Sequence, residues 1–436
     1  MENENRQMRK DTPVTMSITD QSVLKAPEFS EDNIMRTHSF IPFHVPSIGD
    51  EEIREVEATL RSGWLTTGPR AIQFENDFGA YVHAPHAVAV SSCTAGLHVA
   101  LAALGLKRGD QVITTPFTFC STVHTILQAN AKPVLADIGS DGNIDPDAIA
   151  KAITPRTRAI VVVHLAGLPC DMSAIWDLAR RHGLFVIEDA AHAAGSHYRG
   201  HPIGMAAPEG GEASDAVVFS FYATKNMTTG EGGMVTTPSE SLAGRIRVLS
   251  LHGMSRNAWN RYTERGHWYY EVVDGGFKYN LTDIQAALGI CQLRKLESFV
   301  ETRTRYAQIY NQAFAGLEEV ELPADRPDVR HSWHLYILRL NLERLNINRK
   351  DFIEELRQRG VGSSVHFIPI PLHPYFARMS LADRPCPRAL DLYSRCVSLP
   401  LYPAMTEEQV HYVADCVKEI VASRRIRSHH FLSEAV

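Results

Sequence analysis

Short apolar runs alternate with helix-like patterns between about residues 85 and 240. Most of these runs lack strict alternation of apolar and polar residues, which is typical of strands buried on both faces of a mostly parallel sheet. The strand candidates are Ala87–Val90, Gln111–Thr114, Pro133–Asp137, Ala159–Val163, Leu184–Glu188, Ala216–Phe221 and Met234–Thr236. Between the first two, apolar residues from Leu97 to Leu104 recur at helical spacing. The pattern predicts a layered α/β domain built on a mostly parallel, seven-stranded sheet.

A helix is predicted before this region. It follows Ser47, carries Ile53, Val56 and Leu60 on one face, and ends near residues 62–63, where a serine is followed by glycine.

The pattern changes after residue 282. A long helix is predicted to start at Thr282, with Ile284, Leu288, Leu293 and Leu296 among its apolar positions. A strand over His334–Leu340, a helix around Asp351–Arg359 and a strand over Val361–His366 follow. The last helix opens with the capping-box spacing of Thr406 and Gln409, and its apolar stripe is Val410, Val413, Val417 and Ile420. This part predicts a smaller α+β domain.

Four segments are therefore expected. Residues 1–40 are polar and mixed in charge, which predicts a disordered or loosely packed leader. Residues 41–295 form the large α/β domain, residues 296–425 the small domain, and residues 426–436 a tail.

Composition restricts the class of protein. The 436 residues are 44% hydrophobic and 22% charged, as in ordinary globular proteins, and 44 basic against 50 acidic residues give a net charge of −6. This charge argues against nucleic acid as a partner. The seven cysteines include no CxxC pair, no apolar run is long enough for a membrane span, and residues 1–39 lack the apolar stretch of a signal peptide. We expect a cytoplasmic protein without a membrane partner.

Lys225 follows a buried strand and precedes a glycine-rich turn in the sequence SFYATKNMTTGEGG, residues 220–233. Most lysines lie on solvated surfaces, and that reading stays open from position alone. A lysine held against an apolar sheet, however, is desolvated, which lowers its pKa and makes it an amine nucleophile toward a carbonyl.

Asp189 ends the apolar strand of VIEDAAH, residues 186–192. Ligands of open α/β sheets bind beyond the carboxyl ends of the strands, so this carboxylate lies where a cofactor would. A helix N-cap is the alternative. Beside a pyridine ring, a buried carboxylate would keep the ring nitrogen protonated.

The third motif, VSSCTAG at residues 90–96, leads from a strand into a helix. Small hydroxyl residues there expose backbone N–H groups at a helix N-terminus, which suits a phosphate; plain capping is the alternative. A phosphate site, a carboxylate and a lysine are thus predicted at the ends of three strands of one sheet.

Together these motifs resemble the DegT/DnrJ/StrS sugar aminotransferases, a branch of the fold-type I pyridoxal phosphate (PLP) enzymes. The resemblance covers roughly residues 40–425. It rests on SGWLTTGP at 62–69, SSCTAGLH at 91–98, PFTF at 116–119, VIEDAAHA at 186–193, FSFYATKN at 219–226, TTGEGG at 228–233, YNLTDIQAALG at 279–289, GVGSSVHF at 360–367 and SLPLYP at 398–403. It implies the aspartate-aminotransferase-like fold, PLP as cofactor, and transfer of an amino group from L-glutamate to a nucleotide-linked keto sugar.

The resemblance also implies roles for individual residues. Lys225 would be the Schiff-base lysine and general base, and Asp189 would pair with the pyridine nitrogen. The remaining cofactor contacts would be Phe119 on the ring face, His192 near the ring's 3-oxygen, and Thr94, Ala95 and Ser220 at the phosphate. His366 would line the sugar channel.

A homodimer with shared active sites is implied as well, because Asn280 would reach the phosphate of the partner subunit's cofactor, with Lys278 close by as a substrate contact. Many relatives have asparagine where this chain has Lys278, and arginine at position 280. The GFKYN order, residues 276–280, resembles the subgroup that includes the aminoarabinose-lipid transaminase.

Several alternatives remain. The CTAG sequence at 93–96 favours transamination at C-4 of the sugar over C-3 by family analogy. Sugar dehydratases of the family replace the lysine by histidine, so Lys225 argues against that reaction, and the intact Lys225–Asp189 pair argues against a non-catalytic regulatory protein. His197, His201, His331 and His334 lack a third ligand at suitable spacing, so no metal site is predicted.

Overall fold

A computed structural model describes residues 40–205, 213–255, 269–379, 381 and 385–426. The residues described from Ile41 onward belong to one compact unit. The predicted leader, apart from Phe40, and the predicted tail, apart from Ile426, lie outside the described residues.

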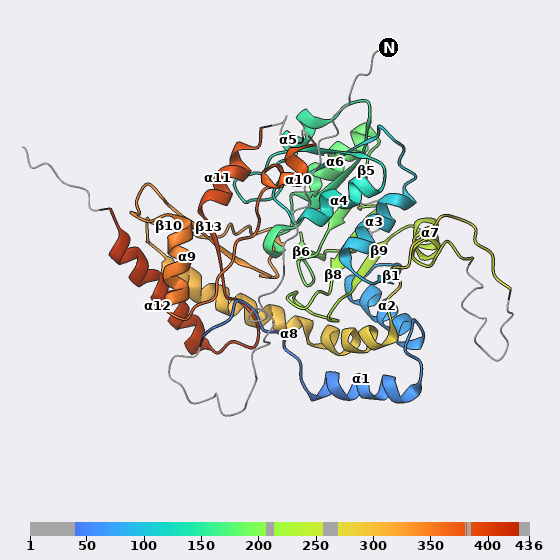
Figure 1. The fold of residues 1–436 in the computed structure, drawn as a ribbon, viewed down its shortest axis with the longest axis horizontal. Helices are drawn as coiled ribbons and strands as arrows, with labels where there is room; N and C mark the ends of the chain where they lie inside the picture. The colour runs from blue at the N-terminus through green and yellow to red at the C-terminus, as the bar shows by residue number, and fades with distance from the viewer. Residues whose placement is uncertain (1–39, 206–212, 256–268, 380, 382–384, 427–436) are drawn as a thin grey trace, which may run out of the picture. The chain divides into compact units, whose positions relative to one another are not determined.

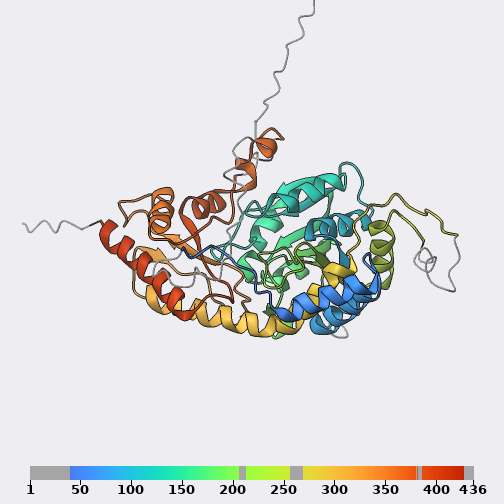
Figure 2. The same cartoon turned by 60° about the horizontal axis from the view of Figure 1, so that its bottom comes forward.

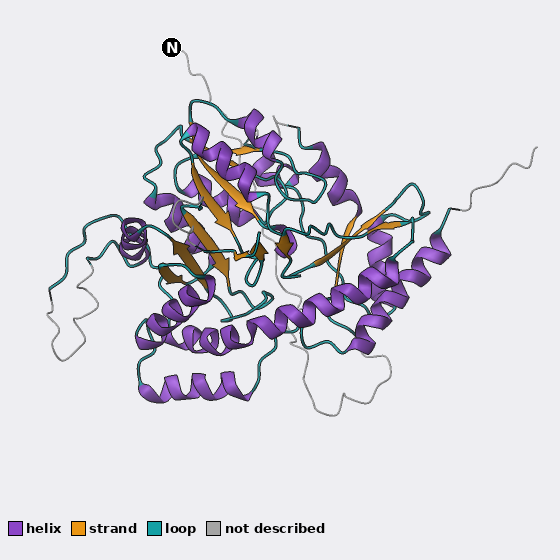
Figure 3. Cartoon of the chain, turned by 180° about the vertical axis from the view of Figure 1, so that it is seen from behind, coloured by secondary structure: helices purple, strands orange, loops and turns teal. Residues whose placement is uncertain are grey.

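The larger sheet has seven strands in the order β1-β9-β8-β5-β4-β2-β3. Figures 1 and 3 show this sheet surrounded by helices. Strand β9 runs antiparallel to its neighbours β1 and β8, and the strands from β8 to β3 are parallel. The strands are β1 (His86–Val90), β2 (Gln111–Thr114), β3 (Lys132–Leu135), β4 (Thr157–Val163), β5 (Phe185–Asp189), β8 (Ala216–Ser220) and β9 (Gly233–Thr237). They confirm the seven predicted strands, with ends that differ by at most two residues.

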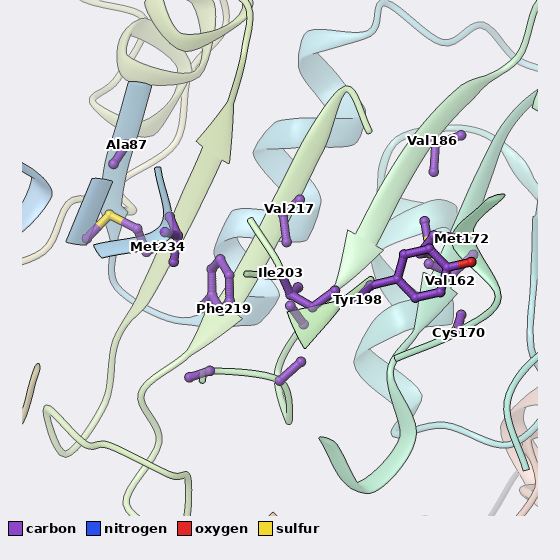
Figure 4. Packing of buried hydrophobic residues seen from close by; sticks show 14 of the residues in the cluster. Ala87, Val162, Cys170, Met172, Val186, Tyr198, Ile203, Val217, Phe219 and Met234 are labelled. Atoms are coloured by element: carbon purple, nitrogen blue, oxygen red, sulfur yellow. The ribbon is translucent and has the colours of Figure 1, made fainter. Parts of the chain in front are cut away.

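Helices cover both faces of this sheet, which explains why its strands are apolar without alternation. One face packs against α2 (Pro69–Val82), α5 (Pro146–Ala152), α6 (Met172–His182) and the first half of α8 (Asp283–Phe314). The other face packs against α3 (Cys93–Ala103), α4 (Cys120–Gln128) and α7 (Glu240–Ser250). Adjacent residues of β8 serve opposite faces: Val217 and Phe219 pack with Tyr198 and Ile203 in the first layer (Figure 4), and Val218 packs in the second.

A second, three-stranded antiparallel sheet has the order β10-β12-β13. Its strands are β10 (Val320–Glu321), β12 (Tyr336–Leu340) and β13 (Cys396–Leu399), and its helices are α9 (Arg349–Gln358), α12 (Glu407–Arg424) and the second half of α8. The long helix, the strand ending at Leu340, the helix around 351–359 and the capped last helix are confirmed. Short elements complete the described chain: β6 (His197–Tyr198), β7 (His201–Pro202), β11 (Val329–Arg330), η3 (Leu165–Gly167), η5 (Ile370–Leu372), α10 (Pro374–Ala377) and α11 (Pro387–Arg395).

The predicted strand Val361–His366 is wrong. Val361 bridges to Ile41, whereas Ser364 bridges to Ser398 at the edge of the second sheet. Because the segment pairs with two separate partners, one residue at a time, it forms no continuous ladder.

Helix α8 contacts both sheets and is continuous over 32 residues, through the predicted domain boundary at 295. Its Gly289 lies against the ring of Phe74 on α2, where a Cβ atom would come within 2.7 Å of the ring. The glycine therefore lets α2 and α8 pack closely. The division into domains at residue 295 stays a prediction.

Helix α1 (Asp50–Ser62) ends as predicted, with Gly63 in the left-handed conformation at φ 75°. It lies beside α8 (Figure 2). Ile53 and Leu60 are exposed by 59% and 52%, whereas Glu52 is fully buried. Its carboxylate accepts from Lys295 Nζ at 2.6 Å, and the helix therefore docks through a polar face.

Two further observations bear on the class of protein. All of the cysteines except Cys120 are buried, as small hydrophobic residues are. Across the described ranges, no helix combines the length and apolar character needed to cross a membrane.

Candidate active site

A cavity of about 530 Å³ opens at the carboxyl ends of β5 and β8. Seven of the residues predicted for the site line it: Thr94, Phe119, Asp189, His192, Ser220, Lys225 and His366. The strand ends of a parallel sheet meet at one edge, which explains why residues far apart in sequence converge here.

Lys225 lies in the turn that follows β8. Its backbone N–H donates to the carbonyl of Tyr222 at 2.9 Å. The next residue, Asn226, is buried and donates from Nδ2 to the carbonyls of Ser332 and Ala194. The lysine is therefore carried by a backbone that is fixed on both sides.

Burial lowers the pKa of Lys225 to about 8, although Cys93 and Asp189 nearby act in the opposite direction. A lysine with this pKa is partly unprotonated near neutral pH. It therefore supplies a free amine, as the sequence predicts.

Asp189 ends β5 and is 4% exposed. Thr122 Oγ1 donates to its Oδ2 at 2.8 Å, and the N–H of Ala191 donates to its Oδ1 at 3.2 Å. Burial raises the pKa of Asp189, while these two hydrogen bonds and the charge of Lys225 oppose the rise. The site thus holds a buried carboxylate that has specific donors.

His192 lies in the turn after β5 and is 6% exposed. Burial lowers its pKa well below the ordinary value, so its ring is neutral. Nδ1 accepts from the N–H of Ala166 at 3.2 Å, which leaves the ring proton on Nε2. His192 is therefore a fixed hydrogen-bond donor.

The N-terminus of α3 forms another wall. Ser92 caps the helix by accepting from the N–H of Ala95 at 3.0 Å, and Ser92 and Thr94 line the cavity. Ala95 is buried and does not line the cavity, and its N–H is directed to the Ser92 cap. Ser220 enters the same cavity from the end of β8.

Aromatic rings and a further histidine complete the walls. Phe119 is 59% exposed, and its ring lies 6.2 Å from that of Phe367. His366 stacks on Phe43, and its Nδ1 lies 2.9 Å from Ser398 Oγ. Burial lowers the pKa of His366 to about 4.

Asn280 and Lys278 are not in this cavity. Asn280 lines a separate cavity of about 390 Å³ between α2, β1 and α7, where its Nδ2 donates to Thr67 Oγ1 at 2.7 Å. Lys278 is exposed and bridges to Leu251. The chain therefore does not bring these two residues to its own lysine.

Sequence reasoning missed several lining residues: Cys93, Thr118, Ser121, Tyr222, Glu231 and Phe367. It also missed Thr122, which does not line the cavity but donates a hydrogen bond to Asp189. Thr118 lies within PFTF and Thr122 follows four residues later, and this pair of threonines is the signal that could have indicated a polar contact.

The four histidines considered as metal ligands have different surroundings. His334 lines the cavity with Nδ1 unpartnered, and His331 stacks on Trp333 with ring centroids 4.0 Å apart. His197 and His201 belong to the pair β6 and β7. Within the described ranges, no group of three histidine, cysteine or acidic side chains is arranged to hold a metal ion.

Comparison with known proteins identifies related chains. Residues 46–418 match the DegT/DnrJ/EryC1/StrS aminotransferase family. The spore coat polysaccharide biosynthesis protein SpsC of Bacillus subtilis is 48% identical over 391 residues, which cover 89% of this chain and 99% of that protein.

Two solved structures have the same fold as this chain. Spr1654 from Streptococcus pneumoniae, in its PLP form, has a TM-score of 0.81 and 32% identity, covering 88% of this chain and 99% of that chain. PseC from Helicobacter pylori, an aminotransferase involved in the biosynthesis of pseudoaminic acid, has a TM-score of 0.81 and 30% identity, covering 88% and 100%.

Proposed function

The chain belongs to the DegT/DnrJ/EryC1/StrS aminotransferase family and is a PLP-dependent sugar aminotransferase, and from this premise we propose that it transfers the amino group of L-glutamate to the C-4 keto group of a nucleotide-linked keto-deoxy sugar. The observation that carries the proposal is the convergence of Lys225, Asp189 and the N-terminus of α3 on one cavity of about 530 Å³.

These residues fit PLP by their chemistry. A lysine with a lowered pKa suits the carbonyl of the cofactor, and a buried carboxylate that accepts two strong hydrogen bonds suits a protonated pyridine nitrogen. The helix N-terminus at Thr94, with Ser220 beside it, suits the phosphate. When bound, PLP supplies an electron-withdrawing ring that stabilises negative charge on the carbon next to the transferred nitrogen.

Lys225 has two tasks in this proposal. Its Nζ holds the cofactor between turnovers. Once freed, the same atom takes the proton from the α-carbon of glutamate, and in the second half of the reaction it delivers a proton to C-4 of the sugar. Its pKa of about 8 suits a group that both accepts and donates a proton near neutral pH.

The surrounding residues orient the cofactor. Asp189 holds the ring nitrogen, and the Nε2 proton of His192 is available to the ring's 3-oxygen, since Nδ1 is occupied. Phe119, whose ring is 59% exposed, would cover one face of the cofactor ring. His366 contacts the sugar from the wall formed with Phe43.

The charge of the residues that line the cavity supports the inference that a second subunit completes the site. Among the described residues that line the cavity, Lys225 is the one lysine or arginine, whereas a nucleotide-linked sugar and glutamate are both anionic. We therefore infer a homodimer in which Lys278 and Asn280 of one copy complete the site of the other. The separation of Asn280 from its own Lys225, in a different cavity, supports this arrangement.

The test is a panel of substrates. Purified enzyme with PLP and L-glutamate is incubated with UDP-, GDP- and dTDP-linked 4-keto sugars and with a 3-keto sugar, and the amino sugar is measured by mass spectrometry. We expect at least one 4-keto sugar to be aminated, with release of 2-oxoglutarate. Lys225→Ala is the matched inactive control.

Amination of the 3-keto sugar alone would overturn the C-4 assignment. If the sugar loses a hydroxyl and gains no nitrogen, the reaction is a dehydration and not the transfer of an amino group. If another amino acid supports turnover and glutamate does not, the proposed donor is wrong.

A further inference from the structure

Two buried threonines form a chain of hydrogen bonds that leads to Asp189. Thr122, on the first turn of α4, donates to Asp189 Oδ2 at 2.8 Å, and its Oγ1 lies 2.9 Å from that of Thr118. Thr122 is fully buried and Thr118 is 2% exposed. Thr118 also lines the cavity.

The direction of these hydrogen bonds follows from counting protons. A hydroxyl has one proton, and that of Thr122 is donated to Asp189 Oδ2. Thr122 must then accept the proton of Thr118. The result is a directed chain, Thr118 to Thr122 to Asp189, that ends on the carboxylate.

We infer that this chain holds Asp189 in its ionised form, which makes Thr122 a positioning residue for the reaction. The inference rests on the proposed function, in which Asp189 binds the pyridine nitrogen. Burial favours the neutral acid, whereas hydrogen bonds from a hydroxyl favour the anion. Without them the proton shared by the nitrogen and Asp189 moves to the carboxylate, and the ring loses its positive charge.

Other groups also face Asp189. Lys225 approaches it from the turn after β8, and Cys93 Sγ lies 3.8 Å from Oδ1. His164, at the end of β4, acts on it through charge and is bound to Glu188 at 2.7 Å. Because these groups are unchanged in variants of α4, they are constant across the comparison.

The experiment compares Thr122→Val with Thr125→Val. Valine has nearly the shape of threonine, so each variant removes one hydroxyl. Thr125 is a matched control because it is fully buried in the same helix and donates to the backbone carbonyl of Thr122, not to Asp189. Thr122→Ser restores a hydroxyl, and Thr118→Val removes only the outer donor.

Two measurements are made on each holoenzyme. The ¹⁵N chemical shift of labelled PLP reports whether the pyridine nitrogen is protonated, and steady-state kinetics separate kcat from KM. For Thr122→Val we expect the unprotonated shift and a fall in kcat of roughly 10- to 100-fold, as for one hydrogen bond to a charged group, with KM for glutamate changed less than about threefold. Thr122→Ser should recover both, and Thr118→Val should move both in the same direction by less.

If Thr122→Val matches Thr125→Val in both measurements, the inference is overturned. If Thr122→Val does not fold, Thr118→Val decides, since an unchanged ¹⁵N shift there would refute the chain. Asp189→Asn separates this failure from a failure of the proposed function: activity within about tenfold of wild type would show that Asp189 does not hold the ring.

Discussion

His331 gives the protein a built-in sensitivity to acid that a measurement of stability can detect. Its ring is 7% exposed, stacks on Trp333, and accepts the N–H of Trp333 on Nδ1 at 2.8 Å. Burial lowers the pKa of His331 to about 3 from an ordinary 6.5. The folded protein therefore keeps this ring neutral at pH values where the unfolded chain protonates it.

The sign and size of the effect follow from linkage. A histidine with a lowered folded-state pKa contributes stability that is present above pH 6.5 and is lost as the pH falls below it. Each pKa unit corresponds to about 1.4 kcal/mol, so one such histidine should reduce the free energy of unfolding by about 2 kcal/mol between pH 8 and pH 5. That is a large part of a typical total of about 5–15 kcal/mol.

The variant His331→Asn removes the titrating ring and leaves an acceptor, Oδ1, near the position of Nδ1. We expect it to be less stable than wild type at pH 8, because it loses the stacking on Trp333. Between pH 8 and pH 5, however, it should lose about 2 kcal/mol less than wild type does. Urea unfolding at a series of pH values, with equal protein concentration and saturating PLP, measures the difference.

His411→Asn provides the comparison at an exposed position on α12 and measures what the same substitution does at a solvent-facing site. Parallel curves of stability against pH for wild type and His331→Asn would refute the reasoning, because they would mean that His331 takes up a proton in the folded protein.

Two further predictions concern the site. Borohydride reduction of the yellow holoenzyme should fix PLP to the peptide that contains Lys225, and modification of another lysine, seen by peptide mass spectrometry, would refute that assignment. Mixing equal amounts of Lys225→Ala and Asn280→Ala subunits should produce about half mixed dimers, so roughly a quarter of wild-type sites should reappear at limiting PLP. The limiting PLP matters because losing Asn280 alone costs only ~1.5–3 kcal/mol of phosphate binding. Activity no higher than the average of the separate variants would mean that Asn280 serves its own subunit.

The large sheet was predictable because its strands are buried on both faces, so that each appears as a short apolar run between turns. The cavity residues at strand ends were predictable for a related reason. Once Asp189 and Lys225 are placed at the ends of parallel strands, the topology of the sheet brings them together.

Features that depend on distant partners were not predictable. Glu52 looks like a solvated residue, and its burial follows from Lys295 and Gln292 on α8. Val361 and Val365 have the composition of a strand, but their segment meets two separate partners. Thr122 looks like an ordinary residue of a first helical turn until the fold places the Asp189 carboxylate beside it.

The polar docking of α1 onto α8 has a consequence for the order of events during synthesis. The partners of Glu52 lie 240 and 243 residues later in the chain, and the N–H of Gly68 before α2 binds Asp283 across 215 residues. At a synthesis rate of about 5–20 residues per second, α1 waits on the ribosome for roughly 10–50 s before its partners are made. During that time the face of α1 that carries Glu52 lacks the side chains that bury it in the folded protein. Helix α1, the first helix of the described residues, is thus held in place only after α8 has been made, and a nascent chain that stops before α8 leaves Glu52 without its partners.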